Sequence, residues 1–325
     1  MLRVVVTGAA GYLGSVLCSK LLRAGHAVRA FDNLLHGGLP LLSLIGQENF
    51  EFIRGDIRDS MAVAAALDRA TVLVHLAAIV GDPACAHDPD TALVVNHEAS
   101  LDLIAAAVRS RVERFIFAST CSNYGRMSDT SVLAKEDHML RPVSLYAKTK
   151  VAVEQALLAA SQSGFHPTIL RFATLYGLSP RMRFDLTVNQ FAMEMQTNGH
   201  LVVFGEQFWR PYVHVRDAAQ GILDCLDAPE ERVGGEIFNI GTTPENFRKQ
   251  DLVDLIQARL RQPARVERVT KVEDLRDYRV SFDKAARTLR FTARNTVRSG
   301  IDEIISALEA GIIPNPTDTG YCNVR

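Results

Sequence analysis

Two patterns of apolar and polar residues alternate along the first half of the chain. Short, nearly continuous apolar runs are typical of strands that are covered on both faces. Stretches with apolar residues every three or four positions separate these runs and predict helices. The predicted strands are residues 2–8, 27–32, 50–56, 71–78, 113–120 and 166–173, and the predicted helices are Tyr12–Ala24, Met61–Leu67, Ala99–Val108 and Leu145–Ser161. Strands that alternate with helices indicate an α/β fold, a doubly wound parallel sheet with helices on both faces.

The pattern becomes less regular after residue 175. Short predicted strands (201–205, 236–241 and 265–269) are mixed with loops and with predicted helices at Asp185–Gln196, Asp217–Leu226, Lys249–Leu260 and Ile301–Glu309. We interpret this half as a smaller, discontinuous α+β lobe. The predicted division is therefore a first domain over residues 1–175 and a second lobe over residues 176–325, with returns to the first domain near residues 213–225 and 237–241.

Composition and charge narrow the class of partner. The 325 residues are 47% hydrophobic and 22% charged, with a formal net charge of −1, which is ordinary for a folded soluble protein. Such a balance gives no global field for a nucleic acid or a membrane surface, so a small-molecule partner is favoured. The apolar N-terminus reaches a glycine loop too soon for a signal peptide, and no apolar run approaches about 18 residues. Five cysteines without CxxC spacing indicate reduced thiols, a cytoplasmic location and no metal site.

A glycine-rich loop joins the first predicted strand to the first predicted helix. Its sequence, TGAAGYLG over residues 7–14, places Gly8, Gly11 and Gly14 in a GxxGxxG pattern, a variant of the dinucleotide-binding fingerprint. Gly8 suits the tight turn, Gly11 allows the backbone to approach a pyrophosphate, and Gly14 allows the helix to pack closely on the strand. The positive end of the helix would then meet the phosphates. The first domain is therefore predicted to be of the Rossmann type.

Asp32 selects the dinucleotide. It ends the second predicted strand, where a carboxylate accepts hydrogen bonds from the adenosine ribose and repels a 2′-phosphate, so NAD is favoured over NADP. The alternative is an aspartate that only caps a turn. His75 is expected to be a packed strand-end histidine rather than a catalyst. The other predicted cofactor contacts are Tyr12, Leu13, Asn33, Asp56, Ile57, Leu76, Ala77, Ala78, Asn96 and Phe172.

Tyr146 and Lys150 form the strongest candidate for chemistry. They lie four residues apart in YAKTK, so their side chains share one face of the predicted helix. A neighbouring ammonium and a positively charged nicotinamide would both favour the phenolate of a tyrosine, whose pKa is otherwise about 10. Tyr146 is then a candidate general base for a substrate hydroxyl. Lys150 would also bind the nicotinamide ribose, and Thr120 would orient the same hydroxyl.

Together these motifs resemble a known family. TGxxGxxG, Asp32, HLAA at residues 75–78, the ST–YG strand end, YxxxK and RPYVHVRD at residues 210–217 are similar to the extended short-chain dehydrogenase/reductases of nucleotide-sugar metabolism, with UDP-galactose 4-epimerase and dTDP-glucose 4,6-dehydratase as prototypes. The resemblance covers nearly the whole chain. It implies a nucleotide-diphosphate sugar as substrate and a catalytic triad of Thr120, Tyr146 and Lys150. It also implies that Arg210 and Arg276 bind the diphosphate, the alternative being surface ion pairs.

Departures from the family pattern narrow the reaction. Cys121 and Ser122 stand where the 4,6-dehydratases carry Asp and Glu, and the decarboxylases also carry Glu at the second position, so both reactions are disfavoured. Cys121 is more typical of a small buried residue than of a catalytic thiol. Residues 177–189, GLSPRMRFDLTVN, resemble a subgroup that includes GDP-heptose 4-dehydrogenases.

The same departures give the remaining substrate candidates. Thr174 replaces an asparagine that is common in the family. Arg181, Arg183 and Asn189 would contact the sugar or its phosphates, or the two arginines would fix a loop through ion pairs.

The leading hypothesis is an NAD-dependent 4-epimerase that oxidises and reduces C4 of the hexose. The alternatives are a net 4-dehydrogenase, a 4-keto-reductase, and a non-catalytic NAD-binding sensor. The apolar faces of Ala99–Val108 and Leu145–Ser161 correspond to the dimer interface of the family, so a homodimer is expected, with core packing as the alternative explanation.

Overall fold

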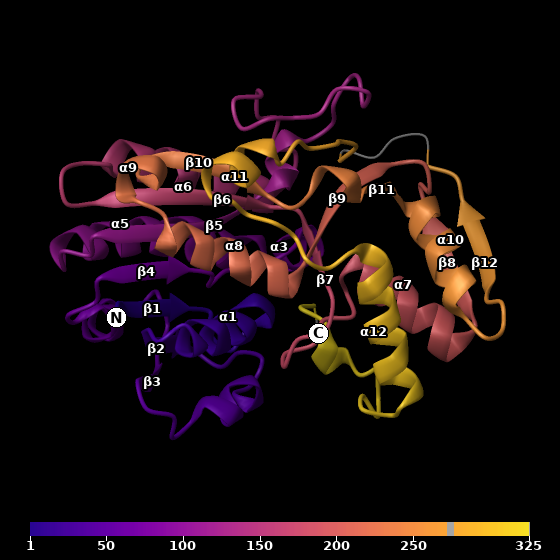
Figure 1. Cartoon of the computed structure of the whole chain (residues 1–325), viewed down its shortest axis with the longest axis horizontal. Helices are drawn as coiled ribbons and strands as arrows, with labels where there is room; N and C mark the ends of the chain where they lie inside the picture. The colour runs from indigo at the N-terminus through magenta and orange to yellow at the C-terminus, as the bar shows by residue number, and fades with distance from the viewer. Residues whose placement is uncertain (272–275, 325) are drawn as a thin grey trace.

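A seven-stranded parallel sheet forms the centre of the protein (Figure 1). The computed structural model describes residues 1–271 and 276–324. Strand order is β10-β6-β5-β4-β1-β2-β3, and the strands span β1 Arg3–Thr7, β2 Ala27–Asp32, β3 Phe50–Arg54, β4 Val72–His75, β5 Arg114–Thr120, β6 His166–Phe172 and β10 Glu236–Ile240. The chain reverses its winding direction between β1 and β4, which is where ligands bind in sheets of this kind. The predicted Rossmann-type α/β fold is confirmed.

Helices cover both faces of this sheet because alternate residues of the strands are apolar on both sides. Val4 and Val6 of β1 belong to one apolar core, and Val5 belongs to the other. The first core includes residues of α1 (Tyr12–Arg23) and α8 (Val215–Asp227), which pack against each other. The second core includes residues of α2 (Ser60–Leu67), α5 (Ala99–Arg109) and α6 (Leu145–Ala160). The long apolar runs of the sequence therefore reflect burial from two sides.

The helical stretch Pro89–Arg109 is long and apolar enough, by length and composition alone, to cross a membrane. It comprises α4 (Pro89–Leu93), a π-helical turn at Val94–Glu98 and α5. Leu103, Ile104 and Ala107 of this stretch are buried in the second core together with Phe115 of β5. The apolar side chains of this stretch are thus explained by their packing on the sheet.

The second half of the chain builds two small sheets beside the large one. One has the order β11-β9-β7, with β7 Thr174–Tyr176, β9 Trp209–His214 and β11 Asn246–Arg248; the other pairs β8 His200–Phe204 with β12 Arg265–Val269. The helices of this half include α7 Thr187–Met193, α10 Lys249–Arg259 and α12 Val297–Glu309, which pack together. The remaining short helices are α3 Asp82–His87, α9 Glu230–Val233 and α11 Asp283–Thr288.

The predicted helix Asp185–Gln196 is shorter as an α-helix, because α7 passes into a π-helical turn at Glu194–Asn198. The chain does return to the large sheet near residue 237, where β10 pairs with β6. In the other predicted return, residues 213–225, α8 packs against α1 and β6, while β9 stays in the small sheet. The division at residue 175 remains a prediction.

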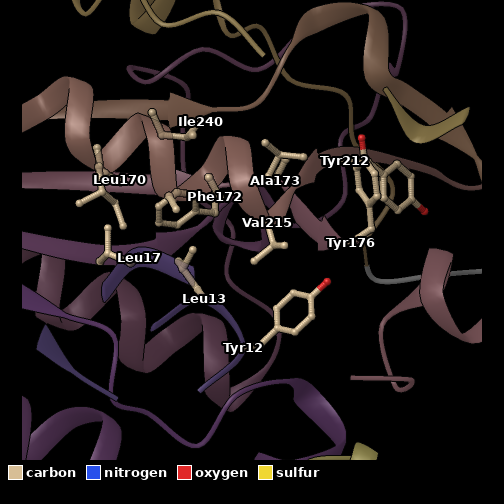
Figure 2. Packing of buried hydrophobic residues seen from close by; sticks show 14 of the residues in the cluster. Tyr12, Leu13, Leu17, Leu170, Phe172, Ala173, Tyr176, Tyr212, Val215 and Ile240 are labelled. Atoms are coloured by element: carbon tan, nitrogen blue, oxygen red, sulfur yellow. The ribbon is translucent and has the colours of Figure 1, made fainter. Parts of the chain in front are cut away.

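A shared core joins the large sheet to the second half of the chain. Figure 2 shows Tyr12, Leu13 and Leu17 of α1 facing Leu170 and other apolar residues from the sheet and from the start of α8. Polar contacts extend this junction, since the Tyr12 hydroxyl donates to the carbonyl of Gly177 and accepts from Asn189 at 3.1 Å. The position of α1 is therefore fixed from both sides.

We predict that Gly14→Ala disrupts the junction of β1 and α1. A Cβ at Gly14 would lie 2.1 Å from the Gly8 carbonyl oxygen and 2.8 Å from Ala9, and neither backbone atom has room to move. Unfolding free energy should fall by about 3 kcal/mol or more, as measured by urea denaturation. Gly38→Ala is the matched control, because its Cβ would meet only Leu34 side-chain atoms at 3.5 Å. Equal stability of the two variants would contradict the prediction.

Candidate active site

A cavity of about 790 Å³ lies at the carboxyl ends of the parallel strands. Its walls come from the ends of β1 to β6, the start of α1 and α6, and loops of the second half of the chain. Most of the predicted site residues line it: Gly8, Gly11, Tyr12, Leu13, Gly14, Asp32, Asn33, Asp56, Ile57, Leu76, Ala77, Ala78, Thr120, Tyr146, Lys150, Phe172, Thr174, Arg181 and Arg276. The fold therefore gathers distant parts of the sequence around one chamber.

The glycine loop shapes the end of this cavity that suits a pyrophosphate. Gly8 has a φ of +71°, and a Cβ there would lie 2.8 Å from the Ala77 nitrogen. Helix α1 begins at Tyr12 with no side-chain cap from Gly11 and no acidic residue in its first turn. The first N–H groups of a helix carry partial positive charge and bind anions. The residues present therefore fit the diphosphate of NAD.

Asp32 lies at the end of β2 and lines the same part of the cavity. Its two carboxylate oxygens accept hydrogen bonds from the backbone of Ala10 at 2.9 Å and Leu34 at 2.7 Å. Burial raises the pKa of Asp32, and these two hydrogen bonds counteract the rise. The aspartate thus does cap a turn, in agreement with the alternative interpretation. Its position still allows a ribose contact, which stays a prediction.

The neighbouring Asp56 has a partner that the sequence analysis did not single out. Arg58 holds the Asp56 carboxylate with hydrogen bonds of 2.9 Å, and Asn33 donates to it at 2.9 Å. The hydrogen bonds from Arg58 keep the pKa of Asp56 well below its usual range. Arg58 also lines the cavity, and its position two residues after Asp56 was the only signal for it in the sequence.

Thr120, Tyr146 and Lys150 meet at the next part of the wall. Thr120 ends β5, where its hydroxyl accepts from the Ser122 nitrogen at 3.1 Å. Tyr146 lies in the first turn of α6, which Ser144 caps by accepting from the Ala147 nitrogen at 3.2 Å. The Lys150 ammonium lies 5.8 Å from the centre of the Tyr146 ring. The same wall thus carries a hydroxyl, a phenol and an ammonium.

The electrostatic state of Tyr146 in the ligand-free protein differs from the state expected with the cofactor bound. Burial raises its pKa above the ordinary value, and the charge of Arg183, not that of Lys150, acts in the opposite direction. Lys150 donates instead to the Ala118 carbonyl at 2.8 Å and lies 4.6 Å from the centre of the Phe117 ring. The expected lowering of the Tyr146 pKa by Lys150 together with the nicotinamide stays a prediction for the cofactor-bound protein. Tyr146 is therefore protonated before a cationic cofactor enters.

A buried ion pair supports this wall from behind. Glu154 lies one helical turn after Lys150 and pairs with Arg171 of β6 at 2.7 Å, both side chains being almost fully buried. Its carboxylate also accepts from the Ser119 hydroxyl and from Asn123 at 2.8 Å. These contacts tie α6 to β5 and β6. The sequence analysis missed them, because the spacing of Lys150 and Glu154 alone does not reveal the partner on β6.

The far end of the cavity carries paired charges. Arg183 binds Asp185 through two hydrogen bonds of 3.0 and 2.7 Å. Arg276 forms an ion pair with Asp82 at 2.7 Å. All four residues line the cavity together with Arg181. Both roles considered for Arg183 are thus compatible with its position, because it fixes a loop and also faces the chamber.

Three predicted contacts lie outside the lining. The Asn96 amide is occupied by the backbone of Ile79, at 2.7 and 2.9 Å. Asn189 is buried and holds the backbone of Gly177 at 2.9 Å and of Arg183 at 2.9 Å. Arg210 is also buried, donates to the Trp209 carbonyl at 2.7 Å, and lies near the Tyr278 ring. The side chains of Asn96 and Asn189 hold neighbouring backbone, and their contacts with cofactor and substrate stay predictions.

Three residues match their structural interpretations. His75 is buried between Thr7 at 2.8 Å and Ser100 at 3.1 Å, and burial lowers its pKa to about 3, so it is a neutral packed histidine. Cys121 is fully buried and donates to the Arg171 carbonyl at 3.2 Å. Ser122 lines the cavity without a carboxylate. In residues 1–271 and 276–324, no group of three His, Cys, Asp or Glu side chains is arranged to hold a metal ion.

The fold and the site together define a class: an NAD-binding enzyme of the short-chain dehydrogenase/reductase type, with a Tyr–Lys pair beside the cofactor cleft. The sequence profile of the NAD dependent epimerase/dehydratase family matches residues 4–241, and the chain belongs to this family.

Relatives within this family act on nucleotide sugars. The chain is 32% identical to a protein of Bacillus subtilis (strain 168) described as an uncharacterized UDP-glucose epimerase, YtcB, over 74% of this chain and 77% of the relative. Among solved structures, the UDP-glucose 4-epimerase of Thermus thermophilus in complex with NAD is 27% identical, with a TM-score of 0.83, over 95% of this chain and 99% of that one. MoeE5 in complex with UDP-glucuronic acid and NAD is 26% identical, also with a TM-score of 0.83 and the same coverage. Relatives named as a decarboxylase and a 4,6-dehydratase also match, so membership alone does not fix the reaction.

We predict that Lys150→Met stabilises the protein at neutral pH while abolishing activity. Burial lowers the pKa of Lys150 from 10.5 to about 8, which corresponds to a cost of about 3 kcal/mol for burying the ammonium. Loss of the hydrogen bond to Ala118 offsets about 1–2 kcal/mol of the gain. The variant should therefore exceed the wild type in unfolding free energy by about 1–2 kcal/mol at pH 7.

The sign of this difference depends on pH. Between about pH 8 and 10.5 the unfolded chain binds the proton that the folded Lys150 has lost, so the stability of the wild type rises and the advantage of the variant disappears. Urea denaturation at pH 7 and pH 10 measures this change. Lys148→Met, at an exposed position of the same helix, is the control and should differ little between the two pH values. If the Lys150 variant exceeded the wild type in unfolding free energy by the same amount at both pH values, the lowered pKa of Lys150 would be refuted.

Proposed function

We propose that this protein is an NAD-dependent 4-epimerase of a nucleotide-diphosphate sugar. The observation that carries the proposal is the meeting of Thr120, Tyr146 and Lys150 on one wall of a cavity whose other end fits a dinucleotide. Relatives whose names specify UDP-glucose 4-epimerase activity support the same interpretation.

The chain's residues divide the proton chemistry at C4. NAD, when bound, accepts the C4 hydrogen with its electron pair and later returns it. Tyr146 takes the proton of the C4 hydroxyl and Thr120 orients that hydroxyl. Lys150 holds positive charge beneath the phenolate, at the cost of its own burial. Because Tyr146 is a phenol in the ligand-free protein, it accepts the C4 hydroxyl proton only after its own proton has left to solvent, and the positive charge of a bound cofactor would favour that loss.

The residues after Thr120 argue against the other reactions of the family. Water loss and decarboxylation need a carboxylic acid beside the sugar, and Cys121 and Ser122 stand at those positions. Cys121 points into the interior and hydrogen-bonds to backbone. Exchange of hydrogen at C4 needs neither acid, so this wall supports epimerisation and equally the net 4-dehydrogenase and 4-keto-reductase alternatives; the relatives named as 4-epimerases favour the first.

The proposed substrate carries its diphosphate near Arg276, with Arg181 and Thr174 as further contacts. Arg276 and Arg181 both line the cavity, and guanidinium groups suit pyrophosphate oxygens. Arg210 lies outside the lining and donates to the Trp209 carbonyl, so its contact with the diphosphate stays a prediction from the family resemblance. A GDP-linked heptose remains a hypothesis that rests on the sequence of residues 177–189.

A homodimer through α5 and α6 also remains a proposal. The two helices pack against each other on one face of the sheet, and Leu158 of α6 is 37% exposed. A sedimentation mass of one chain would exclude this assembly.

We predict that Tyr146→Phe lowers turnover by about 10³-fold, because it removes the group that exchanges the hydroxyl proton. The assay incubates NAD-loaded protein with UDP-, GDP-, dTDP- and CDP-sugars and determines the C4 configuration by NMR. An inverted C4 without net reduced cofactor is the expected result. A 4-keto product with one reduced cofactor per turnover would identify the dehydrogenase instead.

Tyr212→Phe is the matched control for this experiment. Its hydroxyl is buried, has no hydrogen-bond partner among the described residues, and lies outside the cavity lining, so its removal should leave turnover unchanged. Full activity of the Tyr146 variant would refute the mechanism. No conversion by the wild type across the panel, with NAD bound, would favour the non-catalytic sensor.

A further inference from the structure

The last described residues of the chain form part of the cavity wall. We call Thr319–Val324 the closing segment; it begins with a short 3₁₀ turn, Thr319–Tyr321, and its residues Cys322, Asn323 and Val324 line the cavity. Figure 1 places this end of the chain between the large sheet and α12. The segment therefore lies where the two halves of the protein face each other.

One set of contacts anchors the closing segment to the loop that precedes α7. The Phe184 nitrogen donates to the Tyr321 carbonyl at 2.9 Å, and the two rings pack edge to face with centres 5.6 Å apart. Arg181 donates to the Cys322 carbonyl at 3.4 Å. These contacts explain why the segment follows the 181–185 loop.

Asn323 connects the closing segment to both halves of the protein by hydrogen bonds. The Asn323 amide donates to the Val80 carbonyl at 3.2 Å, and its backbone nitrogen donates to the Asp185 carboxylate at 3.3 Å. Burial raises the pKa of Asp185, but its hydrogen bonds with Arg183 outweigh this, so the carboxylate stays ionised. Val80 follows β4 in the dinucleotide-binding half, whereas Asp185 belongs to the second half. Asn323 thus bridges the chamber.

The bridge lies close to the reaction centre. Val80, Asp185 and Asn323 line the same cavity as Tyr146. The charges of Arg183, which holds Asp185, and of Asp82, two residues after Val80, also influence the pKa of Tyr146. The segment consequently closes the chamber near Tyr146, beside the sugar of the proposed substrate. The glycine loop that would receive the cofactor phosphates makes none of the contacts described for the segment.

We propose that the closing segment retains the nucleotide sugar, and above all its 4-keto form, inside the chamber. This inference rests on the proposed function. Oxidation breaks the C4–H and O–H bonds of the sugar: the hydrogen leaves with its electron pair to NAD, the hydroxyl proton goes to Tyr146, and C4 becomes a ketone. The ketone has no covalent bond to the protein, so only the walls keep it in place while it turns its other face to the cofactor. Escape would end the cycle with one equivalent of cofactor reduced.

Asn323 is the position at which the inference is tested. Asn323→Ala removes the donor to Val80, and Asn323→Asp also places a carboxylate against the Val80 carbonyl. The NAD-loaded full chain is immobilised and the dissociation of UDP-glucose is followed by surface plasmon resonance. We expect dissociation to be roughly tenfold faster for Asn323→Ala and faster still for Asn323→Asp. Asn315→Ala, at an exposed position just before the closing segment, should match the wild type.

A second readout follows the fate of the ketone. On mixing with UDP-glucose, the Asn323 variants should accumulate absorbance at 340 nm and release 4-keto sugar, while inversion at C4 slows. Unchanged dissociation in both variants would overturn the retaining role, even if the wild type proves to be an epimerase. Faster dissociation in the variants, with a wild type that does not invert C4, would support the segment's role and reject the proposed function instead. The dissociation experiment requires binding but no turnover, so the two failures are distinguishable.

Discussion

The close approach of α1 to the backbone of β1 is the contact on which the site depends. Gly14 meets the Gly8 carbonyl and Gly8 meets the backbone of Ala77, so no side chain fits between them. Because the helix begins directly at this contact, its positive end faces the chamber formed by the carboxyl ends of the strands. The same contact sets the position of Tyr12, through which α1 reaches Gly177 and the second half of the chain. The close backbone packing of α1 on β1 thereby positions the cofactor end and the substrate end of the cavity relative to each other.

The catalytic wall depends on a different interaction, the ion pair of Glu154 and Arg171. Burying two charges is costly, and such pairs persist when the surrounding hydrogen bonds are satisfied. Here Ser119, Asn123 and Arg171 all donate to Glu154, so the carboxylate is fully used. The pair fixes α6 against β5 and β6, and it thereby fixes the distance between the strand end at Thr120 and the helix that carries Tyr146. Glu154 and Arg171, which are not part of the cavity lining, thus support the wall that carries the candidate catalytic residues.

The sequence predicted the large sheet and most of the cavity lining because these features are encoded locally. Buried strands have continuous apolar runs, and the glycine loop and Tyr146–Lys150 pair have fixed spacings. The hydrogen bonds of Asn96 and Asn189 were not predictable in this way, because the spacing of motifs does not identify the backbone groups that their amides contact. The state of Tyr146 depends on burial by residues from several elements. The closing segment shows the same limit, since its partners Val80 and Asp185 lie far away in the sequence.

In the ion pair of Asp82 and Arg276, the Asp82 carboxylate occupies the arginine that is proposed to bind the diphosphate of the substrate. In the ligand-free protein the guanidinium already holds an anion at 2.7 Å, on side chains that are only partly exposed. A diphosphate that engages Arg276 therefore replaces a carboxylate and does not meet a bare cation. Because the Asp82 carboxylate has to be displaced, the binding free energy of the diphosphate is smaller. The Asp82–Arg276 ion pair also re-forms when the ligand leaves, which makes dissociation easier. In the proposed epimerisation, product and substrate differ only in the orientation of one hydroxyl group. Asp82, which competes with the diphosphate for Arg276, would favour the release of either sugar nucleotide equally.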